Sequence, residues 1–242
     1  MSDPVFHADF SGSLPGIGAT VLLDGPEGRH AAVVRRIRVG EQVQLSDGAG
    51  RGIVGPVVAV SKQSITVEVA SQLVEEPPAL RLVVAQALAK GDRGELAVEL
   101  LTEVGVSEIV PWQASRSIVR WTGERGAKGL ARRRSTAREA AKQSRRLLTP
   151  VVGDPVSTAG LAKRVAAADL ALLLHEAAAA SLAEIELPPS GEVLLVVGPE
   201  GGISPEELDL LGAAGGRATL LTPHVLRTST AGVVACAGLL LR

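Results

Sequence analysis

The pattern of apolar and polar positions changes near residue 75. Before that point, short runs rich in Val and Ile predict β-strands at Val43–Leu45, Gly52–Val60 and Ser64–Val69. Asp47–Gly48 and Ser61–Lys62 supply turn residues between them. Short strands spaced this closely predict a small β-barrel.

One helical segment is expected to interrupt these strands, around Gly28–Ile37. Ala31, Val34 and Ile37 would share its apolar face. Basic residues surround that face, and a solvated surface explains them about as well as a contact with RNA does. They are Arg29, His30, Arg35, Arg36 and Arg38.

After a linker at Glu75–Pro78, strands and helices alternate, which predicts a parallel sheet covered on both faces, an α/β fold. The expected strands are Leu80–Gln86, Glu108–Pro111, Leu170–Leu174, Val193–Val197 and Ala218–Leu221. The expected helices are Asp92–Val104 with Leu96, Leu100 and Val104 on one face, Gly129–Leu147, and a last helix from Thr228 or Ser229 to Leu241. We therefore expect two domains, residues 1–74 and 75–242.

A glycine-rich turn is the most informative local feature. Gly198–Gly202 follows the apolar run Val193–Val197 and precedes Ser204–Glu207, which has the spacing of a capping box with Pro205 at the first helical position. The turn matches neither a dinucleotide fingerprint nor a P-loop. Ligands bind at such strand ends in open α/β sheets, but glycines that only shape a tight connection are the alternative interpretation.

Polar residues also follow other strands of this region. Lys90–Arg93, His175–Glu176 and Leu221–Thr228 each come directly after an expected strand. Because the carboxyl ends of parallel strands share one edge of a sheet, we expect these segments and the glycine turn to gather there.

Composition excludes several classes of protein. With two Phe, two Trp and no Tyr, aromatic stacking platforms for single-stranded RNA are not expected. The lone Cys236 cannot form an intramolecular disulfide, and four scattered His predict no metal site. The chain shows no signal peptide and no apolar stretch long enough for a membrane, so a cytoplasmic protein is expected.

The positive charge is concentrated in one segment. The whole chain has a net charge of −1, whereas residues 116–146 contain eleven basic residues against two acids, a net charge of +9. Such a segment predicts contact with an RNA phosphate backbone, and a solvated helix is the alternative. Arg138, Lys142 and Arg145 recur at helical spacing and would share one face.

Several of these segments together resemble the ribosomal RNA small-subunit methyltransferase E family, of the SPOUT class. Gly198–Glu207 with Val225–Thr228 and Thr230–Ala231 carries most of the resemblance. Further similar segments follow in the family's order, namely Arg29–His30, Val34–Arg38, Ala87–Arg93, Thr102–Val106, Arg116–Ser117, Glu139–Arg146 and Leu172–His175.

The resemblance implies a SPOUT-type α/β domain with a deep trefoil knot after an N-terminal PUA-like β-barrel that binds RNA. It also implies a homodimer that uses S-adenosylmethionine to methylate N3 of a uridine in 16S ribosomal RNA, free or in the small-subunit particle. Cofactor contacts would come from Leu174, His175, Gly198, Pro199, Glu200, Gly201, Gly202, Ile203, Leu221, Leu226 and Thr228. The RNA contacts would come from Arg35, Arg36, Arg38, Arg132, Arg133, Arg134, Arg138, Lys142, Arg145 and Arg146.

Methylation at this position requires that the ring nitrogen lose its proton or that the resulting anion be stabilised. Arg227 is the first candidate for the stabilising cation, and Glu200 is a candidate base whose alternative role is to cap the helix near Ser204. The apolar residues Ile203, Leu221 and Leu226 would enclose the adenine, or simply pack in the core.

The chain departs from the family pattern at Thr222, His224 and Ser229, where the family commonly has Gly, Arg and Glu. The alternatives for function are a ribose 2′-O- or transfer RNA base methyltransferase of the same fold, a non-catalytic RNA-binding protein of ribosome assembly, and an enzyme acting on small nucleotides.

Overall fold

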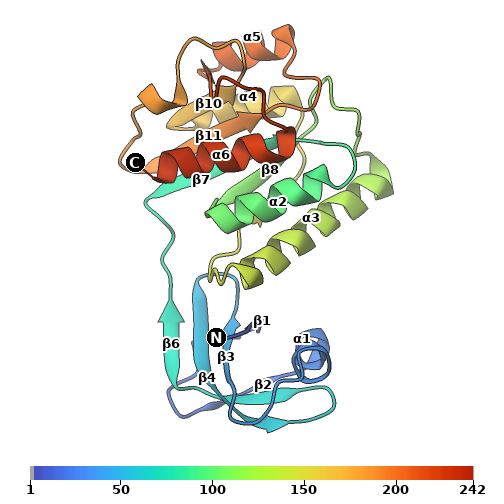
Figure 1. Ribbon diagram of the computed structural model, residues 1–242, viewed down its shortest axis with the longest axis vertical. Coiled ribbons are helices and arrows are strands. Elements are labelled where there is room, and N and C mark those ends of the chain that lie inside the picture. Colours follow the sequence, from blue (N-terminus) through green and yellow to red (C-terminus); the bar gives the residue numbers. More distant parts are fainter. Residues whose placement is uncertain (1–2, 242) are drawn as a thin grey trace. The chain divides into compact units, whose positions relative to one another are not determined.

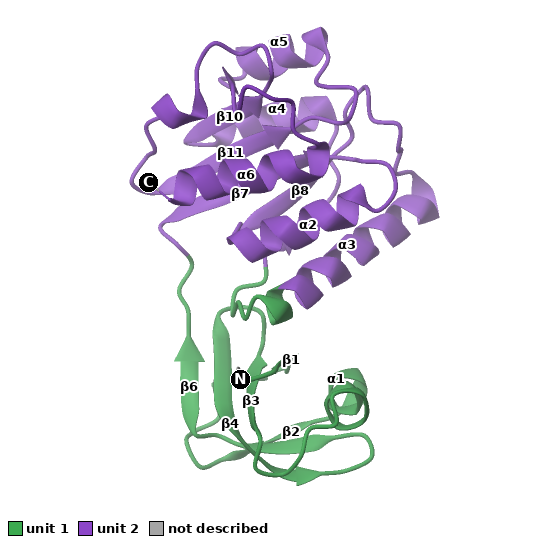
Figure 2. Ribbon diagram, viewed as in Figure 1, with its two compact units in different colours: residues 1–77, 141–149 green, residues 78–140, 150–242 purple. Residues whose placement is uncertain are grey.

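The computed structural model describes residues 3–241, which form two compact units (Figure 2). Unit 1 comprises residues 1–77 and 141–149, and unit 2 comprises residues 78–140 and 150–242. The segment 141–149 therefore belongs with the β-rich unit although it follows the helix of the second region. The Gly50 amide donates to the Leu147 carbonyl at 3.0 Å, and Leu148 forms a β-bridge with Ala49.

Unit 1 is a curled sheet that forms a half-barrel. Its strands are β1 (Val5–His7), β2 (Thr20–Leu23), β3 (Gln42–Ser46), β4 (Arg51–Val60), β5 (Ile65–Glu68) and β6 (Ser71–Val74), in the order β1-β3-β4-β5-β2 with β6 beside β4. A register shift between Val57 and Ala59 lets β4 pair with β3 and β6 and then with β5. Within residues 3–241 no ladder joins β1 to β2, so the predicted barrel is not closed by hydrogen bonds.

The helical segment of unit 1 is shorter and more irregular than its sequence pattern indicates. It consists of α1 (Gly25–Arg29) followed by a π-helical turn, η1 (His30–Val34). The Arg35 amide donates to the His30 carbonyl, five residues back, which rotates the following side chains relative to an α-helix. Ala31 and Ile37 are buried as expected, but Val34 is 65% exposed, so the predicted apolar face was wrong at that position.

Unit 2 contains the predicted parallel sheet, which is confirmed (Figure 1). Its strands are β7 (Leu80–Ala87), β8 (Glu108–Trp112), β9 (Val151–Val152), β10 (Leu170–Leu174), β11 (Gly191–Val197) and β12 (Arg217–Thr219), in the order β12-β10-β11-β7-β8-β9. The helices are α2 (Arg93–Val104), α3 (Gly123–Gln143), α4 (Thr158–Ala167), α5 (Pro205–Ala213) and α6 (Thr228–Leu240), with a short 3-10 helix, η2 (Leu182–Glu184).

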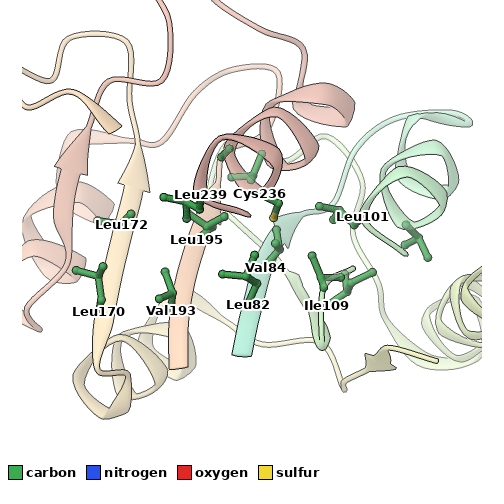
Figure 3. Close-up of a cluster of buried hydrophobic side chains, with 14 of the residues drawn as sticks. Leu82, Val84, Leu101, Ile109, Leu170, Leu172, Val193, Leu195, Cys236 and Leu239 are labelled. Atoms are coloured by element: carbon green, nitrogen blue, oxygen red, sulfur yellow. The ribbon is translucent and has the colours of Figure 1, made fainter. Parts of the chain in front are cut away.

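Alternate residues of the central strands face two separate cores. Val84 and Leu195 pack with Leu101 of α2 and Cys236 of α6 on one face (Figure 3). Their neighbours Val83 and Leu194 pack with α4 and α5 on the other face. Because both faces are covered, the strands read as continuous apolar runs in the sequence, as strands of buried parallel sheets do.

The buried face of α2 differs by one position from the predicted face. The buried residues are Gly94, Ala97, Val98, Leu101 and Thr102, whereas Leu96 is 41% exposed. The prediction followed the largest apolar side chains, but close packing of α2 against α6 places its small residues inside.

Two further expectations concern the whole chain. Among the helices of residues 3–241, none combines the length and apolar character needed to cross a bilayer.

After β12 the chain returns to the middle of the sheet, where α6 packs on α2, β7 and β11. The trefoil knot implied by the resemblance stays a prediction.

Candidate functional site

Segments from four strand ends line one cavity of about 770 Å³, which we call the strand-end cavity. They are Arg93 after β7, Leu174–Glu176 at the end of β10, Gly198–Ile203 after β11, and Val225–Thr228 before α6. The expectation that these segments gather at one edge is confirmed. Gly201 and Leu226 line the same cavity although they are distant in the sequence.

The glycine turn is shaped by specific contacts. The Gly202 amide donates to the Pro199 carbonyl at 2.9 Å, and Gly202 has a φ of +72°, which side chains with a Cβ rarely adopt. A Cβ on Gly198 would lie 2.9 Å from Cγ1 of Ile203. The glycines thus serve the geometry of the turn and at the same time leave its backbone open to the cavity.

The predicted capping box begins α5 directly after this turn. The Glu207 amide donates to Ser204 Oγ, and the Glu207 carboxylate accepts from the Ser204 amide. The carboxylate also accepts from Ser115 N at 2.7 Å, Ser115 Oγ at 2.8 Å and Thr158 Oγ1 at 2.8 Å. Burial alone would raise the pKa of Glu207, but these hydrogen bonds hold it below its ordinary value. Glu207 therefore joins α5 to α4 and to the segment after β8.

A buried hydrogen-bond chain joins the three elements behind the cavity. Gln86, near the end of β7, donates from Nε2 to Thr228 Oγ1 at 2.9 Å and to the Thr228 carbonyl at 3.2 Å. Thr228 Oγ1 in turn donates to the Gly198 carbonyl at 2.8 Å. Both side chains are buried, so the chain fixes the first turn of α6 against the start of the glycine turn.

Glu200 binds the loop after β7 and not the start of α5. Its Oε1 accepts from the Lys90 amide at 3.2 Å and from Arg93 Nη1 at 3.4 Å. Ser204 and Glu207 provide the cap that was the alternative role of Glu200. Glu200 therefore connects the glycine turn to the β7–α2 loop beside the cavity.

Arg227 is the cavity cation that lacks a protein partner. It is exposed and immediately precedes α6, and its guanidinium has no hydrogen bond or ion pair within residues 3–241. By contrast, Arg93 is paired with Glu200, and Arg116 Nη1 donates to the Gly201 carbonyl at 3.1 Å. Arg227 is thus available to an anionic or polar group that enters the cavity.

The remaining predicted site residues lie in or beside this cavity. Leu221 lines a smaller neighbouring hollow of about 80 Å³ together with Leu174, His175 and Leu226, which line both. His175 Nδ1 accepts from the Ala177 amide, which fixes its ring. Ile203 packs in the core and also lines the cavity, so its two interpretations are compatible.

The structure gives a local explanation for one of the three departures from the family pattern, the one at Thr222. Thr222 Oγ1 donates to the His224 carbonyl at 2.6 Å and closes a turn beside the smaller hollow. Ser229 is buried in the first turn of α6. The structure offers no explanation for His224.

The basic segment is arranged differently from its sequence pattern. Arg133 is only 3% exposed, and its guanidinium lies 4.6 Å from the centroid of the Trp121 ring. Lys142 is 7% exposed and pairs with Glu27 at 2.9 Å. Because α3 ends at Gln143, Arg145 is not part of it, and the expected shared face of Arg138, Lys142 and Arg145 was wrong.

Acids from other parts of each unit also neutralise part of the charge. Arg132 pairs with Glu95 and Asp92, and Arg134 pairs with Asp154. Burial lowers the pKa of Arg146 while Glu75 opposes that shift. The net charge of +9 counted along the segment therefore overstates the local positive charge in the folded chain.

Sequence reasoning missed two residues that shape the site, Gln86 and Arg116. Gln86 is a polar residue that interrupts the apolar run following Arg81 in β7, which is a detectable signal for a buried hydrogen-bond partner. Arg116 belongs to a segment of the resemblance, but nothing in its spacing relates it to the glycine turn, whereas Lys90–Arg93 was expected beside that turn.

Comparison with known proteins places the chain in a family. A family model described as an RNA methyltransferase domain matches residues 75–240, and one described as an RNA methyltransferase PUA domain matches residues 23–70. A ribosomal RNA small subunit methyltransferase E from Mycobacterium bovis is 45% identical over 235 residues, which are 96% of this chain and 88% of that protein. The chain belongs to the ribosomal RNA small subunit methyltransferase E family.

Solved structures agree with membership in the methyltransferase E family and with its SPOUT-type fold. A methyltransferase E from Neisseria gonorrhoeae bound to S-adenosyl methionine matches with a TM-score of 0.86 and 28% identity over 99% of this chain and 98% of that chain. A putative methyltransferase from Legionella pneumophila with bound SAM matches with a TM-score of 0.87 and 30% identity over 98% of this chain and 96% of that chain.

Replacing Thr228 with Val removes both hydrogen bonds of its hydroxyl while keeping the side-chain shape. We expect a loss of roughly 1–3 kcal/mol in the free energy of unfolding, because the Gln86 amide and the Gly198 carbonyl lose a buried partner. Urea denaturation measures the loss. Thr228→Ser retains the hydroxyl and should recover most of the stability; equal losses in both variants would contradict the role of the hydroxyl.

The depressed pKa of Glu207 predicts a pH-dependent contribution to stability. A carboxyl whose pKa is lower in the folded chain than its ordinary value of 4.5 stabilises the fold above 4.5, and this contribution is lost as the pH falls through the folded pKa. We expect Glu207→Gln to be less stable than the unmodified chain at neutral pH, and the difference to shrink in acid. Urea denaturation at neutral and at acid pH measures this difference in stability. Glu186→Gln, at an exposed position, is the control. A difference that does not vary with pH would contradict this role.

Proposed function

We propose that this chain transfers a methyl group from S-adenosylmethionine to N3 of a uridine in 16S ribosomal RNA. The observation that carries the proposal is the strand-end cavity, in which an open glycine turn and the unpaired cation Arg227 meet. Family membership supports the reaction class, since the curated relatives are named as methyltransferases of small-subunit ribosomal RNA.

The cavity suits the proposed cofactor in size and chemistry. Its volume of about 770 Å³ lies in the range of small-molecule sites. Ile203 and Leu226 offer apolar walls for an adenine ring, and the backbone of Gly198–Gly202 offers polar groups at close approach. When bound, the cofactor supplies a methyl group already activated on a sulfonium, so the protein has to align it and manage a proton.

Arg227 is proposed as the group that stabilises the uracil. Loss of the N3 proton places negative charge on the uracil oxygens, and a guanidinium without another partner can donate to them. Glu200 stays a candidate base because it lines the same cavity, with one carboxylate oxygen held by Lys90 and Arg93. We assign the cofactor-contact role to the remaining predicted residues that line this cavity and its smaller neighbour.

RNA binding is proposed to use both units. Residues 1–74 would act as a PUA-like domain through the exposed Arg35, Arg36 and Arg38, and residues 75–242 as the methyltransferase domain. In the basic segment the exposed members are the proposed contacts, namely Arg132, Arg134, Arg138 and Arg145. Phosphate contacts of this kind would position the RNA and leave chemistry to the cavity.

A homodimer is part of the proposal. Exposed apolar residues occur on α6 and just before and after it, including Val225, Val234, Leu240 and Leu241. Apolar side chains exposed along one terminal helix are available to contact a second copy of the chain. The substrate would be met in the cytoplasm, which the unpaired Cys236 also suits.

Methyl transfer tests the function directly. Purified protein incubated with labelled cofactor and small-subunit particles that lack the modification should label the ribosomal RNA, and nucleoside mass spectrometry should find 3-methyluridine. A label on ribose or on transfer RNA would contradict the proposed position. Absence of both label and cofactor binding would favour a non-catalytic RNA-binding protein.

Replacing Arg227 with Ala separates chemistry from cofactor binding. We expect methyl transfer to fall by about two orders of magnitude or more, because a cation at the developing charge is lost, while cofactor affinity changes little. Calorimetry measures the affinity. Arg217→Ala is the matched control, since Arg217 is exposed at the edge strand β12 and does not line the cavity. Parallel loss of affinity and activity would assign Arg227 to cofactor binding instead.

A further inference from the structure

Arg133 is a buried cation whose guanidinium is only partly satisfied. One face of the guanidinium lies over the Trp121 ring, but its Nη1 is buried with no hydrogen-bond partner in the part of the chain that the structure describes. Burial lowers the pKa of Arg133 to about 10, with Glu95 opposing the shift, so the group is still charged at neutral pH. A buried, charged donor without an acceptor is costly, and native proteins rarely keep one without a reason.

The start of α2 adds a second positive feature beside Arg133. A Cβ on Gly94 would collide with Nη2 of Arg133, so the guanidinium packs directly on the first turn of α2. Asp92, at the N-cap position of α2, makes no capping hydrogen bond with residues that the structure describes. The positive end of the α2 dipole and the Arg133 cation therefore lie together, an arrangement that an anion would stabilise.

The surroundings form a cavity of about 290 Å³, which we call the Arg133 pocket. Its cations are Arg125, Lys128, Arg132 and Arg133, and Glu95 is its one acid among the described residues. Glu95 already pairs with Arg132 at 3.3 Å, and its charge also acts on Arg133. Lys128 pairs with Glu124 on the surface, and exposed pairs of this kind contribute little.

An intermediate hollow of about 930 Å³ lies between the Arg133 pocket and the strand-end cavity and shares lining residues with both. It shares Gly91 and Glu95 with the Arg133 pocket. It shares Arg93 and Glu200 with the strand-end cavity. All of these residues belong to unit 2, so the three spaces are neighbours along the β7–α2 loop.

We propose that the Arg133 pocket binds one phosphate of the RNA backbone next to the target uridine. The inference rests on the proposed function and adds to it a defined contact for the substrate. A uridine whose base reaches the strand-end cavity would leave its ribose, and not a phosphate, in the intermediate hollow, whose lining includes the acids Asp92, Glu99 and Glu200. The neighbouring phosphate would then enter the Arg133 pocket beside the first turn of α2, and a small movement of the Arg133 side chain would bring the buried Nη1 to it. Arg133 is thereby an RNA contact within a pocket and not on an open helical face.

Salt-dependent RNA binding tests the pocket. The full chain is titrated with a ribosomal RNA fragment containing the target position, by fluorescence anisotropy from low to moderate salt. We expect Arg133→Met to weaken binding at low salt by roughly ten- to a hundredfold and to reduce the slope of affinity against salt by about one. Cofactor affinity should be unchanged.

Two further variants keep the result interpretable if Arg133→Met does not fold. Arg125→Gln alters an exposed residue of the pocket and should reduce the salt slope. Lys163→Gln removes the same charge from the exposed face of α4 and should leave the slope unchanged. A neutral methylphosphonate at the bound linkage should weaken binding of the unmodified chain more than that of Arg125→Gln.

The proposal is overturned if folded Arg133→Met and Arg125→Gln have the same salt slope as the unmodified chain. It is also overturned if every methylphosphonate weakens RNA binding of Arg125→Gln and of the unmodified chain equally. Stabilisation of the chain by inorganic phosphate without any change in RNA binding would assign the pocket to free phosphate and would also overturn it. Because these measurements need no turnover, absence of methyl transfer by the unmodified chain would count against the proposed function alone.

Discussion

The site depends on a hydrogen-bond chain that runs through the interior of unit 2, from Gln86 to Thr228 to Gly198. Each of these groups belongs to a different segment. Gln86 in β7 and Thr228 at the start of α6 are 142 residues apart in the sequence. Backbone packing alone places the strand ends at one edge of the sheet. The buried amide and hydroxyl then fix the glycine turn and the first turn of α6 relative to each other, since either group would be unsatisfied in another arrangement.

Around this interaction the polar groups divide between structure and chemistry. Glu207 accepts four hydrogen bonds from Ser115, Thr158 and Ser204 and anchors the start of α5. Glu200 holds the β7–α2 loop. Arg227 alone among the arginines lining the strand-end cavity has no partner within the described residues. Arg227 is therefore the cavity arginine whose guanidinium is available to a substrate.

The sequence predicted the alternation of strands and helices in most of unit 2 and the gathering of its strand ends, because hydrophobic periodicity is a local property. It also predicted the capping box of α5 from three residues, Ser204, Pro205 and Glu207. It did not predict the two-residue strand β9 or the helix α4. It misplaced the buried face of α2, since close helix packing favours Gly94 and Ala97 over the larger Leu96. The basic segment was misjudged for a different reason. Charges were counted along the chain, whereas Glu27, Glu95 and Asp154 approach the segment only in the folded units.

Segment 141–149 has a consequence for the order in which the protein matures during synthesis. Unit 1 requires the Leu147 carbonyl as acceptor for Gly50, and it requires Lys142 as the partner of Glu27. Both arrive only after the first strands and two long helices of unit 2 have been translated. An N-terminal domain usually folds as it leaves the ribosome, before the rest of the chain is made. Here the β-rich unit lacks the contacts of its last nine residues until they emerge from the exit tunnel.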